Sequence, residues 1–143
     1  MQSDNEKMLQ EIVQNTEMGK NTQDELMGLT YDQKLKDEMM RQKNEYRRLN
    51  QQAHTALDAI GAQAKGQSAA ARMSVSMGIR TRTMLDKSTR NLATMLAEGS
   101  GQGVLDCKRA ERDYPEASPG AFKLCHELGA FQSDAEETWR GFV

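Results

Sequence analysis

Apolar residues recur at steps of three and four along most of the chain, which is the spacing of one face of an α-helix. The pattern is clearest between residues 32 and 60, where an apolar stripe alternates with faces rich in Lys, Asp, Glu and Arg. The stripe there consists of Leu35, Met39, Gln42, Tyr46, Leu49, Ala53, Ala56 and Ile60. A stripe of this kind predicts a long helix whose apolar side packs against other helices.

Start and stop signals divide the chain into helical segments joined by short loops. Ser3 and Glu6 form a capping box, Ser88 and Ser118 are favoured capping residues, and Pro119 suits the first position of a helix. Either Thr30 or Asp32 is expected to cap the second helix. The predicted helices span residues 4–28, 32–60, 68–85, 89–113 and 119–141.

The other helices carry weaker stripes. The first stripe comprises Leu9, Ile12, Val13, Thr16, Gly19, Gln23 and Leu26. The third comprises Met73, Met77, Arg80 or Thr81, and Met84. The fourth begins with Leu92, Met95, Leu96 and Gly99, and the fifth comprises Leu124, Leu128, Phe131, Ala135, Thr138 and Phe142.

Long helices with short connections predict the fold class. We expect an all-α protein, namely an antiparallel (up-down) four-helix bundle with a short extra helix before the long fourth segment. Residues 1–143 form a single domain by length. Few aromatic residues and only two prolines disfavour a sheet-based fold.

Three glycines in five positions interrupt the fourth helical stripe. Each glycine costs a helix about 1 kcal/mol relative to alanine. Gly99 and Gly103 share one helix face, and Gly19 lies midway along the first stripe. One interpretation is a close helix crossing of Gly19 on Gly99 and Gly103. The other is that the glycines make room for a ligand or metal between helices.

Carboxylates near the middles of the helices suggest a second hypothesis. A looser metal site, for iron or another divalent metal, would use Glu17, Glu45, Glu98 and Asp106. The Glu-x-x-His motif of di-iron bundles is absent, because neither His54 nor His126 follows a glutamate by three positions. The alternative is that these carboxylates pair with nearby cations or face solvent.

Cys107 and Cys125 lie at equal distances from the turn at residues 115–117. In a helical hairpin such residues occur at the same height, so the two thiols could approach each other. They are either a redox-sensitive thiol pair or two small buried residues.

Composition and charge narrow the class of protein. The net charge is −2 and the pI is near 5.7, which argues against a dedicated nucleic-acid binder. A stretch of cations between Arg72 and Arg90 could meet an acidic partner or nucleic acid, although such a stretch is more often complemented by the acidic face of its own bundle or of a dimer mate. No interleaved aromatic residues support stacking on bases, so nucleic acid is the less favoured partner. Ten methionines indicate either an adaptable core or a methionine-rich binding surface. No signal peptide or membrane span is predicted, so we expect a cytoplasmic protein.

Several short patterns resemble one bacterial family. They are Asn15-Thr16-Glu17-Met18-Gly19-Lys20, Tyr46, Asp86-Lys87-Ser88, and the segment from Leu92 to Gly103. Together they resemble a group of small uncharacterised helical proteins from clostridia and their relatives, described as ferritin-like bundles. The resemblance implies a ferritin-like architecture with a break near Asp86. Ferritin-like bundles often bind metals, whereas no activity is implied.

These observations favour a binding role over catalysis. P-loop, GxSxG, HExxH and CxxC motifs are all absent from the sequence. The leading hypothesis is a non-enzymatic helical bundle that assembles with itself or binds a protein partner. A low apolar fraction and the methionine-rich third segment favour a homodimer. The competing hypotheses are a metal-binding or redox ferritin-like protein and a thiol switch.

Overall fold

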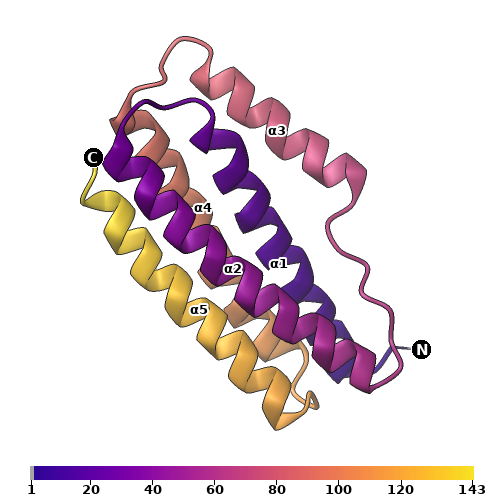
Figure 1. Cartoon of the computed structure of the whole chain (residues 1–143). Coiled ribbons are helices and arrows are strands. Elements are labelled where there is room, and N and C mark those ends of the chain that lie inside the picture. Colours follow the sequence, from indigo (N-terminus) through magenta and orange to yellow (C-terminus); the bar gives the residue numbers. More distant parts are fainter. Residues whose placement is uncertain (1) are drawn as a thin grey trace.

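The chain is all-α over the residues that the structure, a computed structural model, describes, which are 2–143 (Figure 1). Its five helices are α1 (Asp4–Met27), α2 (Gln33–Ala59), α3 (Ala69–Thr83), α4 (Thr89–Asp113) and α5 (Pro119–Arg140). No strand occurs in this range. The predicted helical class is therefore confirmed, and each helix end lies within two residues of its predicted position.

Side-chain caps explain where the helices begin. Ser3, Ser68, Ser88 and Ser118 each accept a hydrogen bond from the backbone N–H three residues ahead. Asp32 caps α2 by accepting from the backbone N–H of Leu35 at 3.2 Å. Thr30 does not cap α2, because its Oγ1 accepts from the backbone N–H of Asp32 itself.

The four long helices, α1, α2, α4 and α5, lie side by side and are called the body below. In Figure 1, α1 and α2 form one hairpin, α4 and α5 form another, and α3 runs along the outer side of α1. None of the helices within residues 2–143 combines the length and the apolar character that crossing a membrane requires.

The core of the body is divided into two apolar clusters. The first core cluster includes Met8, Leu9, Ile12, Val13, Tyr46, Leu49, Ala53, Leu57, Cys107, Ala110, Ala121, Leu124, Cys125 and Leu128. The second core cluster includes Leu26, Leu35, Met39, Ile79, Leu92, Ala93, Leu96, Ala97, Ala135 and Trp139. On every long helix, a buried polar residue falls between these two groups.

We call these buried polar residues the polar layer: Thr16 and Gln23 of α1, Gln42 of α2, Ser100 of α4 and Gln132 of α5. Each is at most 4% exposed. Because burying a polar group without a hydrogen bond costs free energy, the partners of these residues determine what the middle of the body can do.

The α3 stripe is the largest departure from the sequence prediction. Met73, Met77 and Met84, which were predicted to form the stripe of this helix, are 65%, 60% and 73% exposed, so these three methionines are surface and not core residues. Ile79 and Thr83 are buried instead. Ile79 joins the second core cluster from α3 and Val75 packs against it, so the methionines are left on the outer surface.

Candidate binding sites

The outer face of α3 is the most exposed apolar surface on the helices. Met73, Met77 and Met84 follow steps of four and seven, so they form one stripe along the helix. Leu85, directly after them, is 96% exposed. We call these four residues the methionine stripe.

Positive charge surrounds the methionine stripe. The segment from Arg72 to Arg90 carries five cations, namely Arg72, Arg80, Arg82, Lys87 and Arg90, against the single acid Asp86. Arg82 forms an ion pair with Glu98, with Nη1 and Oε2 2.6 Å apart. The other four cations form no ion pair within the described part of the chain, and their charge therefore faces solvent.

A cavity of about 270 Å³ opens between α1 and α4, at the height of the polar layer. Gly19, Gly99 and Gly103 all line it. Its apolar wall includes Met18, Met95 and Leu96. The three glycines singled out in the sequence therefore meet around one open space.

The atoms nearest to Gly19 and Gly103 belong to side chains of other helices, and the close crossing of Gly19 on Gly99 and Gly103 stays a prediction. A Cβ atom at Gly19 would collide with the ring of Tyr46, and one at Gly103 with the amide of Gln132. A Cβ atom at Gly99 would meet nothing within 4 Å. Two of the glycines thus admit a large side chain from another helix, and the third borders empty space.

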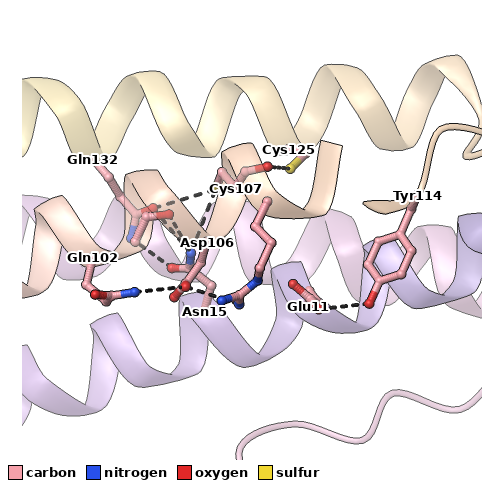
Figure 2. A network of polar contacts seen from close by, with 10 residues as sticks. Glu11, Asn15, Gln102, Asp106, Cys107, Tyr114, Cys125 and Gln132 are labelled. Atoms are coloured by element: carbon pink, nitrogen blue, oxygen red, sulfur yellow. Dashed lines mark hydrogen bonds and ion pairs between the residues drawn. The ribbon is translucent and has the colours of Figure 1, made fainter. Parts of the chain in front are cut away.

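A hydrogen-bonded network forms one wall of the cavity (Figure 2). The Gln132 Nε2 group donates to Asn15 Oδ1 at 2.8 Å and to Tyr46 Oη at 3.2 Å. Asn15 Nδ2 in turn donates to Gln132 Oε1 at 3.3 Å and to the Gly103 carbonyl at 3.4 Å. Burial raises the pKa of the Tyr46 hydroxyl to about 12, so it is neutral over the physiological range.

Gln132 was not among the residues predicted for the fifth stripe, which passed through Phe131. The spacing Leu128, Gln132, Ala135, Trp139 has steps of four, three and four, and all four side chains are buried. The sequence did contain a signal for Gln132: the stripes of α1 and α2 each include a glutamine, Gln23 and Gln42, at a comparable position.

One member of the polar layer lacks a partner at the cavity. Gln23 is 2% exposed and lines the cavity, and its Oε1 atom accepts no hydrogen bond. Gln42 Oε1 and Trp139 Nε1 are also buried without partners, but neither residue lines the cavity. Gln23 Oε1 is therefore a buried acceptor without a partner, covered from the cavity rather than open to it.

The four predicted metal ligands do not come together. Glu45 pairs with Arg48, Glu98 with Arg82, and Asp106 with Arg109. Glu17 accepts from the backbone N–H of Gln67 at 3.1 Å. No group of three His, Cys, Asp or Glu residues within residues 2–143 is arranged to hold a metal ion. Each of the four carboxylates therefore contacts a different partner, and they do not form the shared site that was predicted.

Cys107 and Cys125 lie together in the first core cluster (Figure 2). Both are free thiols, and Cys125 Sγ donates to the Cys107 carbonyl at 3.5 Å. The hydrogen bond with Cys125 and burial both raise the pKa of the Cys107 thiol. These effects disfavour the reactive thiolate, and a redox role for the pair stays a prediction.

Comparisons of the chain with protein-family models, with curated proteins and with solved structures found no match. The resemblance to small clostridial ferritin-like proteins is therefore neither supported nor contradicted by them.

Proposed function

We propose that this chain is a binding protein, not an enzyme, and that it docks an acidic amphipathic helix of another protein onto α3. In this proposal the body is an antiparallel, up-down four-helix bundle of ferritin-like architecture, and α3 is an accessory helix that it carries. The observation that supports this role is the methionine stripe, whose four side chains are 60% to 96% exposed.

Exposed methionines suit a docking surface for physical reasons. Methionine is unbranched and polarisable, so a stripe of methionines can adapt its shape to an apolar partner. An amphipathic helix recognises such a surface through residues spaced three and four apart. The spacing of Met73, Met77 and Met84 matches this geometry.

The charge around the stripe selects the partner. Arg72, Arg80, Lys87 and Arg90 form no ion pairs within residues 2–143, so an acidic partner would complement them. A second copy of this chain joined by the stripe alone would place like charges against each other. The observations therefore favour an acidic partner over the homodimer.

Two designed peptides test this choice directly. One is an amphipathic helix with a leucine stripe and glutamate on its flanks, and the other has lysine at every glutamate position. Binding of each labelled peptide is followed by fluorescence anisotropy. We expect the acidic peptide to bind at least about tenfold more tightly than the basic one, with an affinity that falls as salt is added.

A pair of variants tests whether the stripe is the docking surface. The double variant Met73→Ser, Met77→Ser is expected to weaken binding of the acidic peptide about tenfold or more, because both side chains lose apolar burial. Met40→Ser on α2, where the side chain is 44% exposed, is the matched control and should bind as the unaltered protein does. Equal binding of the two peptides contradicts the proposal. So does a stable dimer in sedimentation that the double variant abolishes, because the stripe would then join two copies.

A further inference from the structure

We propose that the cavity between α1 and α4 binds a small organic cation, a molecule that joins an ammonium group to an alkyl or aryl body. Charged side chains border one end of this cavity, and mainly apolar groups border the other. No residue of α3 lines it. The site is therefore separate from the α3 surface, and it favours the opposite charge.

The two ends of the cavity follow from the antiparallel course of α1 and α4. Glu11, near the start of α1, accepts a hydrogen bond at 3.0 Å from the hydroxyl of Tyr114, which directly follows α4. Further along α1, Asn15 Nδ2 donates to the Gly103 carbonyl at 3.4 Å. The carboxylate of Glu11 therefore lies at one end of the shared wall, and Gly99 lies beyond Gly103 towards the other end.

The charged end carries one more negative charge than positive. The charged residues in the wall are Glu11, Asp106 and Arg109. Arg109 Nη2 lies 3.2 Å from Asp106 Oδ1, whereas Glu11 forms no ion pair within residues 2–143. Whichever carboxylate Arg109 pairs with, the other lacks a counterion. A ligand ammonium group would supply it.

The other groups that contact these carboxylates are neutral, so they do not cancel the charge. Burial and the hydrogen bond to Glu11 raise the pKa of the Tyr114 hydroxyl, which therefore keeps its proton at neutral pH. Gln102 Nε2 donates to Asp106 at 3.1 Å and carries no charge (Figure 2). Because Glu11 is half-buried, an ion pair formed there is screened less than one on the open surface.

The opposite end suits the body of the ligand. Met18, Met95, Leu96 and the bare backbone of Gly99 border it. A Cβ atom at Gly99 would meet nothing within 4 Å, so the space beside this glycine is open. The Ser100 hydroxyl in the same wall already donates to the Leu96 carbonyl at 2.9 Å. An alkyl or aryl group would therefore gain apolar contacts there without leaving this hydroxyl unsatisfied.

The dimensions of the cavity select a small molecule. From Asp106 to Gly99 the wall extends about 10 Å along α4, at 1.5 Å per residue. The volume of about 270 Å³ is near the lower end of small-molecule sites. An alkyl chain of medium length or a single aromatic ring, with an ammonium group at one end, fits this space.

The probe is octylammonium, compared with 1-octanol and octanoate, which share its body but are neutral and negative. Binding is followed through the backbone amides of Glu11 and Gly99 in ¹H–¹⁵N spectra, below the concentrations at which the probes form micelles. We expect both resonances to shift, and octylammonium to bind about fivefold or more tightly than 1-octanol, the worth of one ion pair. Added salt should reduce this preference, and octanoate should bind most weakly.

Two pairs of variants test the two ends of the cavity. Glu11→Gln should keep binding of 1-octanol and remove the preference for octylammonium, whereas Glu116→Gln, an exposed acid outside the wall, should keep that preference. Gly99→Leu should fill the apolar end and weaken binding of both probes about tenfold or more. Its control is Gly78→Leu, a helical glycine of α3 that also borders open space, which should change neither. The spectra of each variant report whether it is folded.

Several results would overturn the proposal. They are the absence of any shift at the highest probe concentration, equal affinities for octylammonium and 1-octanol, tighter binding of octanoate, and an unchanged preference in a folded Glu11→Gln variant. Undiminished binding by a folded Gly99→Leu variant would do the same, as would an equal loss of preference in Glu116→Gln. Shifts confined to α3 would place the probe on the methionine stripe and would equally contradict a site in the cavity.

Discussion

The two core clusters and the polar layer between them differ in composition, although all three are built on the four long helices, with Ile79 of α3 added to the second cluster. In the clusters, residues such as Leu9, Leu49 and Trp139 are almost wholly buried among apolar neighbours. In the polar layer, the buried positions are occupied by Thr, Ser and Gln, and a cavity remains beside them.

The two regions contribute to the stability of the folded chain in different ways. The apolar clusters stabilise the body through the area they remove from water. The polar layer is held in part by hydrogen bonds: Thr16 Oγ1 donates to the Ile12 carbonyl at 2.8 Å and Ser100 Oγ to the Leu96 carbonyl at 2.9 Å. Gln23 Oε1 and Gln42 Oε1 are buried there without a partner. Changes in the clusters should therefore cost most, and changes at the cavity least.

Removing a core side chain is expected to have the largest effect. Leu49→Ala should lower the free energy of unfolding by about 2–5 kcal/mol, because Leu49 is 0% exposed in the first core cluster. Urea denaturation measures this change. Leu105→Ala on α4, where the side chain is 59% exposed, is the control and should cost less than about 0.5 kcal/mol. Equal losses at the two positions would contradict the placement of the core.

Alkaline pH should lower the free energy of unfolding through Tyr46, which lies where the first core cluster meets the polar layer. Burial raises the pKa of Tyr46 from 10 to about 12 in the folded chain. The unfolded chain therefore loses this proton first, so the stabilisation is complete below pH 10 and declines as the pH rises towards 12. The loss should reach about 2–3 kcal/mol.

The matched control for this effect is Tyr46→Phe, which keeps the ring and has no proton to lose. Unfolding of both proteins is measured from neutral pH to pH 12. Their difference in free energy of unfolding should shrink across the alkaline window. A difference that stays constant would mean that Tyr46 is not the titrating group.

Breaking the hydrogen-bonded network should cost less than emptying the core. Gln132→Leu is expected to destabilise the chain by about 1–3 kcal/mol, because Asn15 and the Tyr46 hydroxyl each lose a buried partner. Thermal unfolding measures the loss. Ser133→Leu, the exposed neighbour on α5, provides the comparison and should change stability by less than about 0.5 kcal/mol.

The sequence was sufficient to predict features that depend on neighbours along the chain. The caps at Ser3, Ser88 and Ser118 arise from local hydrogen bonds, and the stripe from Leu35 to Ala53 follows from helix geometry. The last turn of α2 differs, because Leu57 is buried there and Ile60 is 48% exposed.

Features that depend on contacts between helices could not be predicted in this way. Methionine is common on both core and surface positions, so periodicity alone could not show which side of α3 faces the body. Gly19 and Gly103 were correctly seen as places of close approach, but the approaching groups, Tyr46 and Gln132, belong to other helices. The four carboxylates of the predicted metal site do not share a site because each contacts another group, as Glu45 contacts Arg48.

The most direct measurement of the cavity is the stability of Gly99→Leu relative to Gly78→Leu. Both substitutions replace a helical glycine beside open space, so each gains up to about 1 kcal/mol of helix propensity. If the cavity is open, leucine at position 99 also buries apolar surface against Met95 and Met18, and Gly99→Leu should be at least as stable as Gly78→Leu. If α1 instead closes directly on Gly99, overpacking should make Gly99→Leu less stable by about 1–3 kcal/mol, and the cavity would be refuted.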